Sequence, residues 1–128
     1  MPGVQGLIVG EAEAGRFYAA ITGGTSPHYW TPEKAHLIDL ETRIGAYLRS
    51  KAPPTSKLRK DLRSYRRQYI GIVREERRVV FANFFCETNR QDWTRKPIAV
   101  DDGGDCFFQL QFDPEKHAFS GLVIQKGG

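Results

Sequence analysis

The C-terminal run from Asp105 to Gln125 constrains the fold more than any other stretch, because its pattern predicts two strands joined by a tight turn. Asp113-Pro114-Glu115-Lys116 suits a four-residue turn, since aspartate is favoured at its first position and proline presets φ at its second. If the turn pairs Phe112 with His117, opposed residues share an apolar face in three further pairs: Leu110 with Phe119, Phe108 with Gly121 and Cys106 with Val123. We therefore expect an antiparallel hairpin with one face in the core.

A helix is predicted from Thr31-Pro32-Glu33 onward. Threonine suits the N-cap, proline the first helical position, and an acid the positive end of the helix dipole. Apolar residues then recur at steps of three and four, at Leu37, Leu40, Ile44 and Leu48. The helix should end before Ala52-Pro53-Pro54 and bury this stripe against a sheet.

Three further segments have the composition of strands: residues 16–21, 64–73 and 79–86. The last two flank the charged turn 74–77, which indicates a second hairpin. The predicted fold class is α+β: one long helix packed on a four- to five-stranded antiparallel sheet. At 128 residues the chain is expected to form a single domain, 1–128, with residues 1–14 frayed or forming an edge strand.

The two cysteines, Cys86 and Cys106, fall at the end of one predicted strand and the start of the next. If those strands are neighbours, a disulfide is geometrically feasible, and the alternative is two reduced core thiols. A disulfide would place the protein outside the cytoplasm, and reduced thiols would place it in the cytoplasm. No apolar run approaches the roughly 20 residues of a membrane span.

Charge is unevenly distributed. Residues 49–78 hold eleven lysines and arginines against three acids, a net charge of +8, whereas the rest of the chain sums to −4. Such a segment can bind polyanions through phosphate contacts, and aromatic residues beside the cations could stack on bases. The candidate residues are Tyr65, Arg66, Arg67 and Tyr69. A solvated surface is the alternative interpretation.

Loops supply the other candidate contacts. The irregular stretch 87–104 is long enough to suggest a role in binding, with Trp93 as its anchor. Tyr29 and Trp30 end a second loop, 23–30, and are read either as a ligand platform or as core residues at the start of the helix.

Catalytic patterns are absent from the sequence. His28, His36, Asp39 and His117 could act as acid or base only if the fold brought them together, and no nucleophile set has a recognisable spacing. We therefore predict no enzyme, no cofactor and no metal site.

The order of elements over about residues 15–125 resembles the cystatin-like fold, and the related NTF2-like roll, in which one helix is wrapped by an antiparallel sheet. The cystatin inhibitory signature Gln-x-Val-x-Gly is replaced by Gln68-Tyr69-Ile70-Gly71, so the resemblance implies no protease inhibition. The segments Tyr29-Trp30-Thr31-Pro32, Asn83-Phe84-Phe85-Cys86 and Asp102-Gly103-Gly104-Asp105-Cys106-Phe107-Phe108, together with Trp93, resemble small uncharacterised bacterial proteins, often exported or lipid-anchored, that carry both cysteines.

The sequence thus favours a small binding module that contacts a protein partner through loops 23–30, 74–77 and 87–104. The alternative is polyanion or nucleic-acid binding through segment 49–78.

Overall fold

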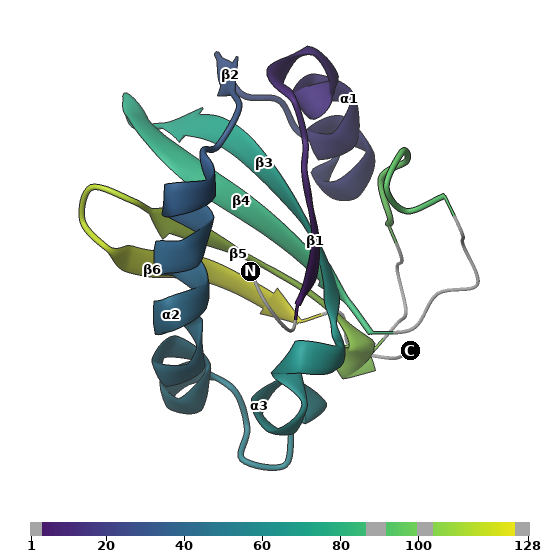
Figure 1. Cartoon of the computed structure of the whole chain (residues 1–128), viewed down its shortest axis with the longest axis vertical. Coiled ribbons are helices and arrows are strands. Elements are labelled where there is room, and N and C mark those ends of the chain that lie inside the picture. The colour runs from purple at the N-terminus through teal and green to yellow at the C-terminus, as the bar shows by residue number, and fades with distance from the viewer. Residues whose placement is uncertain (1–3, 87–91, 100–103, 125–128) are drawn as a thin grey trace.

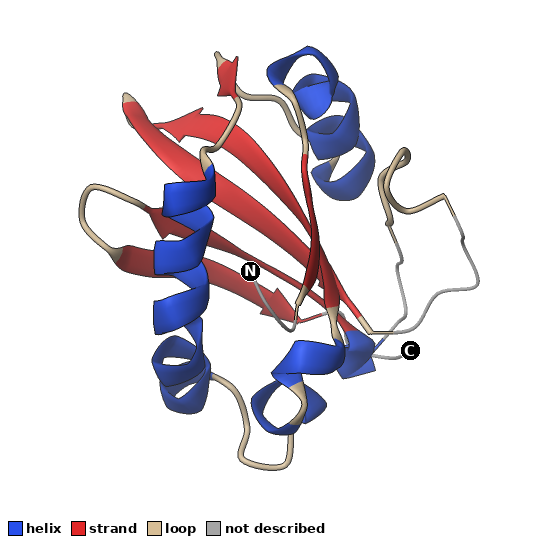
Figure 2. Cartoon of the chain, viewed as in Figure 1, coloured by secondary structure: helices blue, strands red, loops and turns tan. Residues whose placement is uncertain are grey.

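A computed structural model describes residues 4–86, 92–99 and 104–124, with the backbone alone described for Lys60. Within these residues a six-stranded mixed sheet lies between helices (Figures 1 and 2). Its strands are β1 (Gln5–Ile8), β2 (Tyr29–Trp30), β3 (Arg66–Arg74), β4 (Arg77–Phe85), β5 (Phe107–Asp113) and β6 (Ala118–Ile124). The helices are α1 (Glu11–Thr22), α2 (Lys34–Lys51) and α3 (Lys57–Lys60), with short 3-10 turns η1 (Leu62–Ser64) and η2 (Gly104–Cys106).

The strand order is β1-β3-β4-β5-β6, and β2 also pairs with β3. β1 runs parallel to β3 and opposes Arg66 to Tyr69, whereas β2 runs antiparallel and opposes Gly71 and Ile72. The two short strands therefore share one edge of β3.

Both faces of the sheet are apolar at its centre. Leu37, Leu40, Ile44 and Leu48 of α2 pack on one face, against a cluster that includes Tyr69, Ala82, Phe84, Phe108 and Leu110. Phe17 and Tyr18 of α1 pack on the opposite face, against a cluster that includes Ile70, Ile72, Val79 and Phe81. Successive strand residues point to opposite faces, so β3 and β4 contribute to both clusters.

Both predicted hairpins and the amphipathic helix are confirmed, as is the disulfide. Cys86 and Cys106 have sulfur atoms 2.07 Å apart and join the end of β4 to η2. The β3–β4 turn places Glu75 and Glu76 at φ values of 50° and 65°. Such angles are uncommon for residues other than glycine, asparagine and aspartate.

The prediction of one long helix on a four- to five-stranded antiparallel sheet was wrong, because the described residues form three helices and a six-stranded mixed sheet. Residues 16–21, expected as a strand, belong to helix α1, and β1 makes the sheet mixed. Helix signals were present: Glu11 and Glu13 lie in the first turn, and Gly23 ends the helix with a left-handed φ of 77°. Ala14, Phe17, Tyr18 and Ile21 also have the spacing of a helical stripe.

Two boundaries also differ from expectation. Helix α2 begins at Lys34, and its N-cap is Glu33, whose carboxylate and the ring of His36 form a capping box in place of the expected Thr31 cap. In the C-terminal hairpin Phe112 pairs with Phe119, not His117, and Phe108 pairs with Ile124. A four-residue loop ending in His117 at φ 52°, and an irregularity near Gly121 at φ 67°, account for the shift.

Among the helices in the described part of the chain, none combines the length and apolarity that crossing a bilayer requires.

We predict that Gly71→Ala destabilises the fold by about 3 kcal/mol, because a methyl group there would collide with the backbone carbonyl of Trp30. Gly45→Ala is the matched control: a methyl group would meet only the end of the Arg49 side chain, and removing a mid-helix glycine should stabilise by about 0.5 to 1 kcal/mol. Urea unfolding of both variants measures the difference, and equal stabilities would contradict the close approach of β2 to β3.

Candidate functional site

A groove of about 610 Å³ lies beside α2. Its walls come from three elements and from Val4, which precedes β1. The lining residues are Val4, Lys34, Ile38, Glu41, Thr42, Ile44, Gly45, Ala46, Arg49, Leu62, Arg63 and Arg67. We call this hollow the α2 groove.

Helix periodicity explains how α2 forms one wall of the groove. One face of α2 holds residues 34, 38, 41, 45 and 49, each about one turn after the one before it. The stripe from Leu37 to Leu48 lies on the face toward the sheet. On the groove face Ile38 is 48% exposed, and Gly45 contributes no side chain. The groove therefore has an unfilled middle beside the exposed side chain of Ile38.

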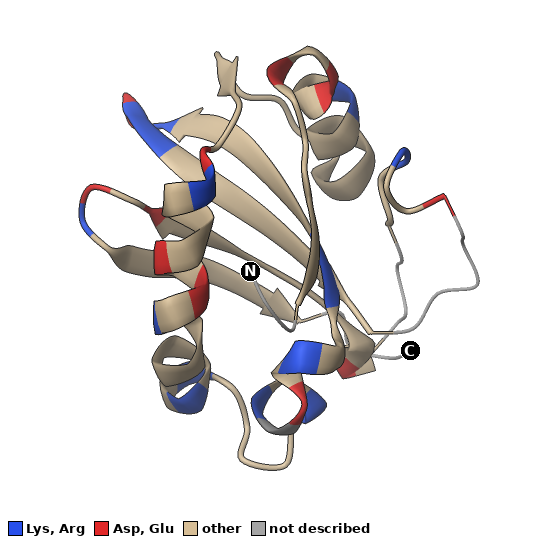
Figure 3. Cartoon of the chain, in the orientation of Figure 1, with Lys and Arg blue, Asp and Glu red and all other residues tan. Residues whose placement is uncertain are grey.

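Three cations surround this middle: Lys34, Arg49 and Arg63. None of their side chains forms a hydrogen bond or ion pair with another described residue. Figure 3 shows basic residues at the C-terminal end of α2 and on the neighbouring α3 and η1. The rim of the groove is thus positively charged and free to meet an anionic group.

The floor of the groove holds a buried charge pair. Arg67, 1% exposed, donates two hydrogen bonds to Glu41, from Nη2 to Oε1 at 2.7 Å and from Nε to Oε2 at 3.1 Å. Tyr69 donates its hydroxyl to Glu41 Oε2 at 2.6 Å. Burial, reinforced by the charge of Glu41, raises the pKa of Tyr69, so this phenol stays protonated.

These contacts change the roles expected for the basic segment. Tyr65 and Tyr69 are fully buried and are not placed to stack on bases. Arg67 is engaged by Glu41, and Arg66 donates to Gln5 Oε1 at 3.0 Å and lies over the ring of Trp93. Of these four residues, Arg67 and the two tyrosines are committed to internal contacts, and Arg66 uses only its Nε–H on Gln5.

The aromatic loop candidates also pack internally. Trp93 packs edge-on against the ring of Phe85 and lies under the guanidinium of Arg66. Trp30 is 5% exposed and donates Nε1–H to the carbonyl of Ile72 at 2.8 Å. Tyr29 packs edge-on against Tyr18 and accepts a hydrogen bond from the backbone of Ser26. These positions fit the core interpretation of Tyr29 and Trp30.

An amide ladder ties part of loop 87–104 to the sheet. Gln68, Asn83 and Gln109 lie opposite one another on β3, β4 and β5. Gln68 donates to the carbonyls of Trp93 and Lys96, both at 2.7 Å, and Asn83 donates to the carbonyl of Ile98 at 2.8 Å. Residues 92–98 are therefore anchored, while 87–91 and 100–103 lie outside the described residues.

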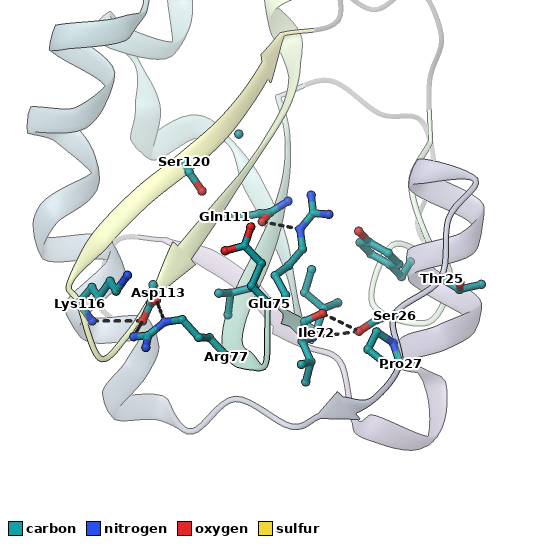
Figure 4. A pocket seen from close by; sticks show the side chains of 15 residues that line it. Thr25, Ser26, Pro27, Ile72, Glu75, Arg77, Gln111, Asp113, Lys116 and Ser120 are labelled. Atoms are coloured by element: carbon teal, nitrogen blue, oxygen red, sulfur yellow. Dashed lines mark hydrogen bonds and ion pairs between the residues drawn. The ribbon is translucent and has the colours of Figure 1, made fainter.

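A second, more polar hollow of about 720 Å³ lies where the two hairpin turns approach loop 23–30 (Figure 4). Several of its charged groups already bind one another. Arg77 pairs with Asp113 at 2.6 Å and with Glu115 at 3.1 Å, and Arg74 donates to Gln111 at 3.1 Å. These contacts join the β3–β4 hairpin to the β5–β6 hairpin.

Two of the four candidate acid or base residues, Asp39 and His117, contact each other. His117 Nδ1 and Asp39 Oδ2 are 2.5 Å apart, which ties the β5–β6 turn to α2. The imidazole of His36 serves as an acceptor in the α2 cap, and His28 does not join the pair. Among the described residues no cluster of three or more histidine, cysteine, aspartate or glutamate side chains could hold a metal ion.

Comparisons with protein-family models, with curated proteins and with solved structures give no match to this chain. The resemblances to the cystatin-like fold and to small bacterial proteins therefore stay predictions.

We predict that Glu41→Gln destabilises the protein by about 3 kcal/mol, because it leaves the buried guanidinium of Arg67 without a counter-charge. Tyr69→Phe keeps that ion pair and should cost about 1 kcal/mol. Chemical denaturation compares the two variants, and a smaller loss for Glu41→Gln than for Tyr69→Phe would refute the assignment.

Acid should weaken the contacts between hairpins. The hydrogen bond from Arg77 lowers the pKa of Asp113, and that from Arg43 lowers the pKa of Asp39. A carboxyl group whose pKa is lower in the folded state contributes stability above its unfolded pKa, which is lost as pH falls through the folded pKa. Between about pH 6 and about pH 3, Asp113→Asn should therefore lose less stability than the parent protein. Glu75→Gln, at an exposed carboxylate outside these ion pairs, should follow the parent curve.

Proposed function

We propose that the protein is an interaction module that binds a polypeptide segment with acidic and apolar side chains in the α2 groove. One observation supports this most strongly: three cations without ion-pair partners among the described residues surround an unfilled groove that exposes Ile38. An exposed apolar surface rimmed by polar groups is typical of a binding site.

The length of the groove favours a polymer as its occupant. Lys34 and Arg49 lie fifteen residues apart on α2, which corresponds to roughly 22 Å at the helical rise of about 1.5 Å per residue. An extended chain covers that distance in roughly seven residues at about 3.3 Å each. Cations near both ends would then meet acids separated by a few apolar positions.

The charges around the groove also favour an acidic polypeptide segment as the partner. Glu41 is the acid that lines the groove, and Arg67 neutralises it, so the field at the rim comes from Lys34, Arg49 and Arg63. Complementary charge at a rim accelerates association and excludes like-charged competitors. We place the contact here in preference to loops 23–30 and 74–77, because their aromatic and charged groups already serve internal contacts.

Polyanion binding is the second candidate. Lys51, Lys57 and Arg59 lie close in sequence to the groove cations Arg49 and Arg63, so this end of the molecule is basic. Phosphate contacts alone could give weak, salt-sensitive binding. Because Tyr65 and Tyr69 are buried, this surface lacks the stacking residues expected for single-stranded nucleic acid.

The disulfide supports placing this module in an oxidising compartment, where such bonds persist.

A displayed library of twelve-residue segments tests the proposal, with glutamate and β-branched residues alternating in one arm and lysine replacing glutamate in the other. We expect the acidic arm alone to yield binders. Gly45→Trp should weaken them by at least about tenfold by filling the groove, while Gly45→Ala should leave binding within about twofold.

Charge provides a separate readout. Arg49→Glu with Arg63→Glu should also weaken binding at least about tenfold, and the loss should shrink in high salt. Unfolding curves check that each variant is folded. Failure of the acidic arm to yield a binder, or binders unaffected by Gly45→Trp, would refute the proposal. Binding of a single-stranded oligonucleotide that Gly45→Trp leaves unchanged would instead support the polyanion alternative.

A further inference from the structure

Strand β1 is an edge of the sheet. It pairs only with β3 among the described residues, and the remaining length of that side of β3 is taken by β2 (Figure 1). Its residues Gln5, Gly6 and Ile8 are exposed. One side of β1 is therefore available to another strand.

The alternation of hydrogen bonds along β1 shows which of its backbone groups do not pair with β3. The N–H of Val9 donates to the carbonyl of Tyr69 at 2.9 Å. In a parallel ladder every second residue directs its N–H and C=O toward the partner strand. Gln5, Leu7 and Val9 thus face β3, while Gly6 and Ile8 direct two donors and two acceptors away from the sheet.

β1 is short, but it lacks two other features that usually protect an edge. Its four residues, QGLI, include no charge and no proline. At the opposite edge, the pairing of β5 with β6 is irregular near Gly121, where φ is 67°. An irregularity of that kind discourages a regular new pairing. Of the two edges, β1 is the better template.

Side-chain alternation places this edge beside the α2 groove. Leu7 and Val9 pack in the cluster under α1, so Val4, Gly6 and Ile8 share the face toward α2. Val4 lines the groove and Ile8 is 39% exposed. The ring of Tyr69 packs directly on Gly6, since a Cβ atom there would lie 2.6 Å from Cε2 of that ring.

We propose that the partner segment binds as an added strand on the outer edge of β1. The inference rests on the proposed function and specifies its mode. Backbone groups of Gly6 and Ile8 pair with the segment, its apolar side chains lie against Ile8 and Ile38, and its acids meet the rim cations. Main-chain pairing supplies affinity, and the groove supplies selectivity for alternate side chains.

The first test uses the strongest binder from the acidic library, made as a synthetic peptide and N-methylated at one residue at a time. An added strand directs every second N–H to β1, so we expect losses of about fivefold or more at alternating positions and little loss between them. Uniform or absent losses along the peptide would overturn strand addition while leaving groove binding intact.

The second test alters the protein. Ile8→Pro removes an outward N–H and keeps the ladder to β3, and proline is tolerated at sheet edges. Ile8→Ala removes the side chain alone. We expect Ile8→Pro to weaken the peptide at least about fivefold more than Ile8→Ala does. Equal losses in folded variants would overturn the mode. If Ile8→Pro does not fold, the N-methyl pattern decides. Absence of any acidic binder would refute the proposed function instead.

Discussion

The ion pair between the buried guanidinium of Arg67 and Glu41 is the interaction on which the arrangement of α2 and the sheet depends. A charge that is 1% exposed requires a counter-charge, and Glu41 supplies it from α2. Because Arg67 lies on β3, the ion pair fixes both the rotation of α2 and its position along that strand. The same rotation turns Lys34, Ile38 and Gly45 toward the groove. One contact therefore holds the fold together and orients the candidate site.

A sheet that is apolar on both faces needs two covering layers. β3 and β4 place side chains such as Tyr69 and Ile70 on opposite faces, and both are fully buried. Helix α2 covers one face and α1 part of the other. Beyond α1 the second face becomes polar, and there the side-chain amides of Gln68 and Asn83 bind the backbone of residues 93–98. The loop thus extends the covering layer by hydrogen bonds.

Local signals in the sequence were sufficient for some elements. The α2 stripe, the two hairpin turns and the cysteine pair were predicted because each depends on residues close in sequence or on a single pairing. Helix α1 was missed because Gly15 and the Arg16-to-Ile21 run suggested a strand. The groove could not be predicted at all: it depends on Arg67 meeting Glu41, twenty-six residues away, and on β1 lying parallel to β3. Neither contact leaves a local pattern.

Two glycines near the groove, Gly6 and Gly45, differ in what packs against them. Gly6 is required by packing, because the ring of Tyr69 occupies the space a side chain would need. Gly45 has no such reason: a Cβ atom would meet only Arg49 Nη1 at 3.4 Å, and glycine within a helix costs about 1 kcal/mol relative to alanine. Internal packing therefore leaves the space beside Gly45 open without requiring it. That space adjoins cations without ion-pair partners among the described residues and lies on the side of the sheet faced by Gly6 and Ile8. Packing, charge and backbone pairing therefore all favour an extended acidic chain as the occupant.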